Sequence, residues 1–233
     1  EKTDGIIHLA CISNDPSFEL NPKLGKSVNY DATIQLVDLA KKYGIKRFIN
    51  ASSSSVYGVK KYAQVTEDLI LEPLTDYSKY KSAAEKYILQ KKSDGFVVLV
   101  IRPATICGYS PRMRFDLTVN MLTIQALVNK KITVFGGRQK RPMIHIQDMA
   151  DMYLKTLEYP ESSINGKVYN VGYRNYTVAE IAEMVKKTIG DPAIVIKTEF
   201  LADLRSYHVS SEKIKRELAK IDVVVESMGG QVP

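Results

Sequence analysis

The feature that most limits the choice of fold is an unbroken apolar run at residues 96–101. A run of strand length without polar interruption is typical of a strand that is covered on both faces. Shorter apolar runs precede it in the chain, and segments with helical periodicity separate the runs. This order of strands and helices predicts an α/β fold, a Rossmann-like doubly wound parallel sheet with helices on both faces. The expected strands are 5–12, 46–52 and 95–103, and the expected helices are 28–43 and 74–92.

Small or polar residues follow each of the three expected strands. They are Ala10-Cys11, Ser52 to Ser55, and Ala104-Thr105. In open parallel sheets, ligands bind outside the carboxyl ends of the strands, where such residues meet along one rim. The sequence therefore predicts a ligand site at this rim.

Tyr77 and Lys81 lie on the second expected helix, four residues apart and hence on one face. A neighbouring ammonium favours the phenolate form, so we expect the pKa of Tyr77 to fall below its usual value of about 10. A tyrosine with a lowered pKa can accept and donate a proton during catalysis. The Ser53 hydroxyl, which follows the preceding strand, could share this proton path.

The Tyr-x-x-x-Lys spacing alone does not select this pair, because the chain has 14 tyrosines and two further matches, Tyr57/Lys61 and Tyr87/Lys91. Tyr57 is expected at the exit of a strand. Tyr87 lies late on the helix, where packing or solvent exposure is expected. Tyr77 stands at the start of a helix that leaves the predicted rim, and we therefore select it.

Composition excludes several classes of protein. The chain has 233 residues, 45% of them hydrophobic and 25% charged, which is ordinary for a globular protein. No segment approaches the ~20 apolar residues of a membrane span, and the first residues do not resemble a signal peptide, so we expect a cytoplasmic protein without a membrane partner. Two cysteines and three scattered histidines predict neither a disulfide framework nor a metal site. The net charge of +7 is dispersed, without the aromatic-interleaved basic stripe of RNA-binding proteins.

The second half of the chain has a less regular pattern. A capping box at Thr177 and Glu180 predicts the start of one helix. The tail from residue 221 to residue 233 is expected to pack poorly. Further helices are expected at 115–130 and 177–189, and a final helix is expected to begin at 210 or 211. Residues 143–150 are expected to lead into a helix that ends at 157. Further strands are expected at 132–135, 168–172 and 193–200.

Eight stretches, in order along the chain, resemble the extended short-chain dehydrogenase/reductases of the nucleotide-sugar epimerase/dehydratase family, in the manner of UDP-glucose 4-epimerase. The resemblance runs from about residue 4 to about residue 218. Its motifs are Asp4-Gly-Ile-Ile-His-Leu-Ala10, Asn29 at a helix start, Ser52-Ser-Ser-Ser-Val-Tyr-Gly58, Tyr77-x-x-x-Lys81 with Glu85, Ile101-Arg-Pro-Ala-Thr-Ile-Cys-Gly108, Arg141-Pro-Met-Ile-His-Ile-Gln-Asp148, Tyr169-Asn-Val-Gly172 and Asp203-Leu-Arg205.

The resemblance implies a role for each matching residue. Tyr77 would be the acid/base for a sugar hydroxyl, Lys81 would lower its pKa and bind the nicotinamide ribose, and Ser53 would bridge the reacting oxygen, with Ser52 and Ser54 as rivals for that role. Residues implied to bind NAD, with NADP not excluded, are Leu9, Ala10, Cys11, Asn29, Ser52, Tyr77, Lys81 and Ala104. Residues implied to bind the nucleotide sugar are Ser53, Thr105, Asn120, Val134, Phe135, Arg141 and Arg205.

Several of these residues also have a purely structural interpretation. Asn29 could cap its helix, and Arg141 and Arg205 could be surface or structural charges. Arg112 and Arg114 could face the substrate phosphate, but a solvated loop is the favoured expectation. His145 is expected to pack at the end of a strand and Cys107 to be a small core residue.

The family's glycine-rich phosphate loop, at the helix N-terminus that holds the pyrophosphate, has no counterpart among the 13 glycines. The chain opens at what resembles the family's fourth strand, so about 60–70 residues would precede it, given two βα units of ~30 residues each. We expect such a fragment or truncated product to bind dinucleotide weakly. With an exposed sheet edge, we expect it either to self-associate or to lack a partner segment.

The resemblance implies two regions. Residues 1–110, joined by 143–172, would form an incomplete dinucleotide-binding core, and 111–142 with 173–233 a substrate-binding region. The implied activity is NAD(P)-dependent epimerisation or dehydration of a nucleotide sugar by a homodimer. Ser54-Ser55 stand where the family's dehydratases carry Asp-Glu, which favours epimerisation. The alternatives are an NAD(P)-dependent carbonyl reductase and a non-catalytic nucleotide- or RNA-binding protein on the same scaffold.

Overall fold

A four-stranded parallel sheet forms the centre of the computed structural model, which describes residues 3–60, 64–200, 206 and 208–218. Its strand order is β1-β2-β3-β7. All three pairings in the sheet are parallel, which confirms the predicted α/β fold. The strands are β1 (Gly5–His8), β2 (Arg47–Ala51), β3 (Val97–Pro103) and β7 (Lys167–Val171).

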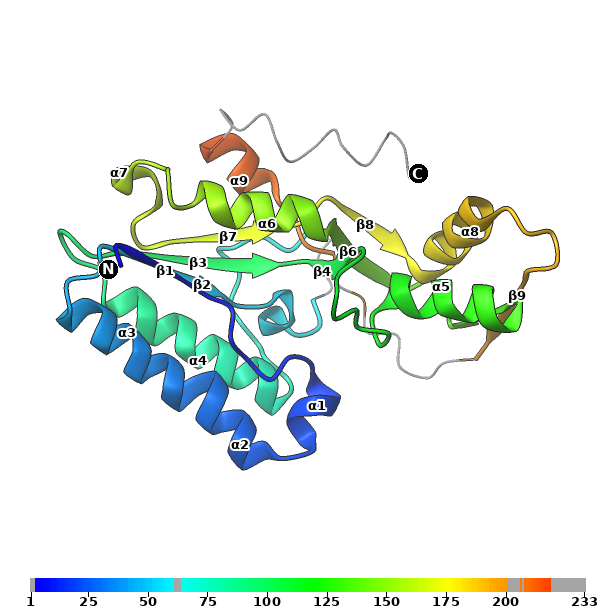
Figure 1. The fold of residues 1–233 in the computed structure, drawn as a ribbon, viewed down its shortest axis with the longest axis horizontal. Helices are drawn as coiled ribbons and strands as arrows, with labels where there is room; N and C mark the ends of the chain where they lie inside the picture. Colours follow the sequence, from blue (N-terminus) through cyan, green and yellow to red (C-terminus); the bar gives the residue numbers. More distant parts are fainter. Residues whose placement is uncertain (1–2, 61–63, 201–205, 207, 219–233) are drawn as a thin grey trace.

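Helices cover both faces of this sheet (Figure 1). Side chains of β3 alternate between two cores, since Val98 packs with one cluster and Val97 and Leu99 pack with the other. This double burial explains why the run 96–101 is apolar without interruption. One face carries α3 (Ala32–Lys42) and α4 (Asp76–Gln90), and the other carries α6 (Ile146–Lys155), α7 (Glu161–Ile164) and α9 (Glu212–Glu217).

The first helical region begins earlier than the sequence pattern predicts. The Asn21 side chain accepts a hydrogen bond from the Leu24 amide, and Pro22 is the first helical residue. An Asn cap followed by proline is a strong helix start, and the expected helix 28–43 did not include it. A separate short helix, α1 (Asp15–Glu19), precedes α2 (Pro22–Lys26), and a π-helical turn (Ser27–Asp31) joins α2 to α3.

The rest of the described chain forms a smaller region beyond the carboxyl ends of the central strands (Figure 1). Its core gathers apolar side chains of two helices and several strands, among them Leu122, Ile132, Met143 and Ile181. The Thr177–Glu180 capping box is confirmed, with both reciprocal hydrogen bonds present. The elements are β4 (Thr105–Cys107), α5 (Thr118–Asn129), β5 (Lys131–Phe135), β6 (Lys140–His145), β8 (Arg174–Thr177), α8 (Val178–Ile189) and β9 (Val195–Glu199).

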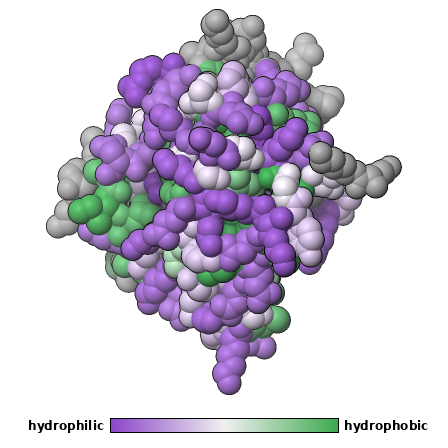
Figure 2. Space-filling view, turned by 90° about the vertical axis from the view of Figure 1, so that its left-hand side faces the viewer, coloured by the Kyte–Doolittle hydropathy of each residue, from purple (hydrophilic) through white to green (hydrophobic). Residues whose placement is uncertain are grey.

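The opposite end of the molecule, where the central strands begin, is mainly hydrophilic (Figure 2). Its hydrophobic residues gather in patches that polar residues separate. Among the described residues, β1 pairs only with β2, so its outer edge is open. The self-association expected from such an edge stays a prediction. None of the helices in the described part of the chain is long and apolar enough to cross a membrane.

Gly58 ends the short 3₁₀-helix 54–57 and offers a test of this local structure. Its φ of 66° is unfavourable for other residues, and a Cβ would lie 2.0 Å from the Glu72 carbonyl oxygen. We expect Gly58→Ala to lower the free energy of unfolding by more than about 2 kcal/mol, since backbone strain and a backbone clash add. Gly44 is a matched control with a φ of 73° and open space around it, so Gly44→Ala should cost only about 1 kcal/mol. Equal losses in urea unfolding would contradict the role of the clash.

Candidate active site

The three strand ends meet at one rim, as the sequence predicts. The amide of Ser52 donates to the Ile101 carbonyl (2.7 Å), and the amide of Ala104 donates to the Val171 carbonyl (2.7 Å). These bonds place the exits of β2, β3 and β7 next to one another. Leu9 and Ala10, which leave β1, are exposed, and Cys11 is half-buried. The rim therefore has an accessible side at β1 and a buried side at β2 and β3.

Tyr77 lies in the first turn of α4, and its side chain is in hydrogen-bonding contact with Ser53. Ser53 Oγ also accepts hydrogen bonds from the Ser55 amide (3.1 Å) and the Ser55 hydroxyl (2.9 Å). Because Ser53 Oγ accepts twice from Ser55, its own hydrogen is available for Tyr77. The hydroxyls of Ser55, Ser53 and Tyr77 are therefore in successive contact. The sequence offered only the serine run as a signal for Ser55, and our prediction missed it.

Lys81 lies one turn after Tyr77 and is buried. Its ammonium donates to the Ala51 carbonyl (2.9 Å) and is in hydrogen-bonding contact with Cys11. Burial lowers the pKa of Lys81, and the contact with Cys11 partly opposes that change. The structure thus brings together Ser53, Tyr77, Lys81 and Cys11, all of which the sequence placed at the site.

The expected fall in the pKa of Tyr77 is wrong for this structure. Burial raises the pKa of Tyr77, and the charge of Cys11 adds to the rise. The hydrogen bond with Ser53 and the charge of Arg114 lower it, but they do not outweigh burial. Tyr77 is therefore a neutral phenol at physiological pH. The sequence could not reveal this, because the helix spacing shows the Lys81 neighbour but not the depth at which the ring lies.

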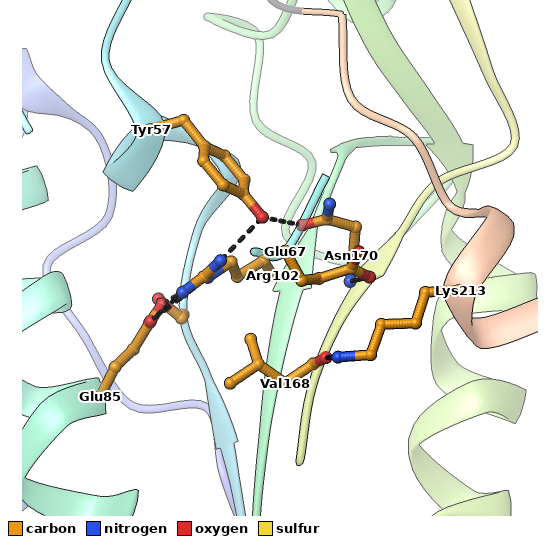
Figure 3. A network of polar contacts seen from close by, with 8 residues as sticks. Tyr57, Glu67, Glu85, Arg102, Val168, Asn170 and Lys213 are labelled. Atoms are coloured by element: carbon orange, nitrogen blue, oxygen red, sulfur yellow. Dashed lines mark hydrogen bonds and ion pairs between the residues drawn. The ribbon is translucent and has the colours of Figure 1, made fainter. Parts of the chain in front are cut away.

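A buried polar network joins Glu85, Arg102, Tyr57 and Asn170 (Figure 3), and it contacts the serine turn, residues 52–55, through Ser52. The Ser52 hydroxyl donates to Glu85, which also accepts from Arg102 Nη2 (2.7 Å) and Nε (3.1 and 3.2 Å). Arg102 Nη1 donates to the Tyr57 hydroxyl (2.7 Å), which donates to Asn170 Oδ1 (2.7 Å). Burial raises the pKa of Tyr57 to about 12, which keeps the phenol able to donate.

The structure also accounts for the two competing Tyr-x-x-x-Lys matches. Tyr57 is a buried residue of the 3₁₀-helix that follows β2, and Lys61 lies outside the described residues. Tyr87 donates to Asp38 (2.7 Å), and Lys91 pairs with the same carboxylate. Both tyrosines therefore have structural partners. Ser52 is not free to replace Ser53, because its hydroxyl binds Glu85.

Asn29 does not cap a helix, so that alternative is wrong. Its side chain accepts from the Ile12 amide (2.8 Å) and donates to the Ile12 carbonyl (2.9 Å). Asn29 lies within the π-helical turn and is buried. Through these two bonds it holds the loop that carries Leu9, Ala10 and Cys11.

Arg114 lies in a loop, as expected, but its side chain is only partly exposed and makes specific contacts. Its guanidinium donates to Asp116 (2.6 and 3.0 Å) and to the Ser13 hydroxyl (2.9 Å), and its charge acts on Tyr77. The side chain of Asn120, a predicted substrate residue, donates to the Arg114 carbonyl (2.8 Å). Arg114 therefore joins the loop after β1 to the segment before α5.

The other predicted substrate residues lie in separate places. The Val134 side chain packs in the core of the smaller region, so it is not available to a ligand. Phe135 beside it is exposed. Thr105 is half-buried on β4, and Arg141 on β6 donates to the Lys140 carbonyl (3.0 Å). Arg205 lies outside the described residues.

His145 and Cys107 have structural roles, as expected. His145 caps α6 by accepting from the Gln147 amide (3.2 Å). Cys107 is a core residue whose thiol contacts the Ile144 carbonyl, and burial raises its pKa. Within the described residues, no group of His, Cys, Asp and Glu is arranged to hold a metal ion.

Comparison with known proteins assigns the chain to a family. The model of the NAD dependent epimerase/dehydratase family matches residues 1–172. The chain belongs to this family. A Bacillus subtilis protein named an uncharacterized UDP-glucose epimerase, YtcB, is 31% identical over 83% of this chain and 61% of its own length. The UDP-glucose 4-epimerase of Lactobacillus helveticus is 26% identical over 82% of this chain and 63% of its own length.

Among solved structures, MoeE5 in complex with UDP-glucuronic acid and NAD has a TM-score of 0.79 and 25% identity, over 93% of this chain and 73% of MoeE5. The epimerase/dehydratase family is thus confirmed as the one that the sequence motifs resemble. The chain spans about three-fifths of the length of the curated relatives named here.

Proposed function

We propose that this chain carries the catalytic and substrate-binding parts of an NAD-dependent epimerase that acts on a nucleotide sugar. The contact of Ser53 with Tyr77, with Lys81 one turn further on α4, is the observation that carries this proposal. These residues lie at the carboxyl ends of the central strands, where open α/β sheets bind ligands. The names of the two curated relatives support a UDP-hexose as the substrate.

Tyr77 would exchange a proton with a sugar hydroxyl, with Ser53 as a hydrogen-bond partner of the same oxygen. As a neutral phenol, Tyr77 is set to donate a proton. The reverse transfer needs a phenolate, which the positive charges of Lys81 and Arg114 would stabilise. Ser55 would keep the Ser53 hydrogen turned towards Tyr77.

The residues at the rim suit a dinucleotide. The ammonium of Lys81 has three donors, and Leu9 and Ala10 give open access from the β1 side. Lys81, Leu9, Ala10, Cys11 and the backbone around Ser52 and Ala104 would hold the cofactor, with Asn29 supporting their loop. Bound NAD or NADP would take a hydride from the sugar carbon and return it.

Asn120, Phe135, Thr105, Arg141 and Arg205 would form the substrate side of the site. Val134 would contribute only backbone, because its side chain lies in the core. Epimerisation is preferred to dehydration because Ser54-Ser55 stand where the family's dehydratases carry two carboxylates, and Ser55 instead supplies a hydroxyl to Ser53. The homodimer, the cytoplasmic location and the boundaries of the two regions remain predictions from the sequence.

The test is incubation of the complete protein with NAD and UDP-glucose, followed by proton NMR of the sugar. We expect the 4-epimer to appear without net conversion of NAD to NADH, since the hydride is returned. A 4-keto product formed with loss of water would instead indicate a dehydratase. Accumulation of NADH without an epimer would indicate a simple dehydrogenase and contradict the proposal.

A further inference from the structure

Three successive residues at the end of β2 are each held by a different side chain of α4. Lys81 donates to the Ala51 carbonyl, Glu85 accepts from the Ser52 hydroxyl, and Tyr77 contacts Ser53. Residues 77, 81 and 85 are four positions apart and share one helix face. The helix therefore fixes the serine turn at three consecutive points.

Glu85 is the best supported of these three anchors. Its side chain is 2% exposed and that of Arg102 is 5% exposed, and Arg102 donates to both carboxylate oxygens. Arg102 is in turn fixed by Tyr57, and Tyr57 by Asn170 on β7 (Figure 3). The carboxylate is thus anchored to β3, to β7 and to the 3₁₀-helix, as well as to α4.

We propose that Glu85 is a positioning residue for the reaction, acting through the Ser52 hydroxyl to hold Ser53 against Tyr77. The proposal rests on the function proposed above, in which Ser53 and Tyr77 handle the proton. Glu85 itself touches neither Tyr77 nor Ser53 in the described contacts. A buried ion pair adds little net stability compared with apolar packing. Its benefit here is a fixed geometry, and a displacement of about 1 Å in a catalytic group can cost ~100-fold in rate.

Ser52→Ala tests this link without leaving a charge unpaired, because it removes only the hydroxyl that joins Glu85 to the turn. We expect kcat to fall about tenfold with KM within about twofold, since the geometry of the reacting groups changes and substrate binding does not. Ser52→Thr restores the hydroxyl and should restore kcat. Turnover of UDP-glucose with NAD by the complete protein is the assay, and crystal structures of the variants report the position of Ser53.

Thr156→Val is the matched control. Thr156 has a fully buried hydroxyl that donates to the Tyr153 carbonyl (2.6 Å), and its own carbonyl binds Arg47, at the start of β2. It therefore loses a comparable buried hydrogen bond at the other end of the strand from Ser52. A general loss of stability would affect both variants, whereas loss of positioning should lower kcat only in Ser52→Ala.

The two proposals fail in different ways. If Ser53 stays against Tyr77 in Ser52→Ala, or if kcat is unchanged while the unmodified protein turns over substrate, the positioning role is overturned and the proposed function stands. If Ser53 moves in Ser52→Ala but the unmodified protein has no turnover, the proposed function is overturned and the structural link from Glu85 to Ser53 is supported.

Discussion

Replacing Tyr77 with phenylalanine is expected to lower kcat for UDP-hexose epimerisation by about 1,000-fold, within the range known for general acid–base groups. The substitution removes the hydroxyl that contacts Ser53 and leaves the ring in its buried position. Binding of the nucleotide sugar should change little, because the proton transfer is lost and not the binding surface. Steady-state kinetics measures the change in kcat, and isothermal titration calorimetry with UDP-glucose measures the change in binding.

Tyr87→Phe is the control for this prediction. Tyr87 lies on the same helix, with Lys91 four residues later, and its hydroxyl also makes a side-chain hydrogen bond, to Asp38. The Tyr87/Lys91 pair has the same spacing as Tyr77/Lys81, but it does not lie at the rim formed by the strand ends. Comparable losses of turnover in Tyr77→Phe and Tyr87→Phe would show that the hydroxyl of Tyr77 has no special part in the chemistry.

The second large effect concerns stability. Glu85→Ala should lower the free energy of unfolding by about 3–5 kcal/mol, because it leaves the Arg102 cation buried without its carboxylate. The Tyr57 hydroxyl cannot replace that charge, since burial keeps it protonated. Urea unfolding monitored by circular dichroism gives the difference.

Two further variants sharpen this result. Lys79→Ala breaks the exposed pair with Asp76, in which both side chains are more than half exposed, and should cost less than about 1 kcal/mol. The double variant Glu85→Leu/Arg102→Met removes both buried charges and should recover much of the loss. If Glu85→Ala costs no more than Lys79→Ala, or if the double variant is the least stable of the set, the buried charge is not the cause.

Local patterns along the sequence were sufficient for the central sheet and for the position of Tyr77, Lys81 and Ser53. Apolar runs, helix caps and the Tyr-x-x-x-Lys spacing depend on residues that are close in the chain. The partners of Glu85 could not be found in this way, because Arg102 and Ser52 are brought to it by the packing of β2, β3 and α4. Depth of burial is likewise a property of the packed structure, which is why the direction of the Tyr77 pKa shift was predicted wrongly.

Asn29 and Val134 illustrate the same limit at the level of roles. Both were assigned to a ligand from the family motif. The structure shows that the Asn29 side chain binds the backbone of the loop after β1 and that the Val134 side chain fills a core. A motif match indicates that a residue type is needed at a position. It does not distinguish a residue that contacts a ligand from one that supports a loop.

The three anchors between α4 and the end of β2 constrain the length of the serine run more strongly than its composition. Inserting or deleting one residue between Ala51 and Ser53 would place a different side chain opposite Glu85 or Tyr77. All anchors lie on one rigid helix face, so the turn cannot shift to correct one contact without losing another. The spacing of Tyr77, Lys81 and Glu85 along α4 therefore determines which serine contacts Tyr77.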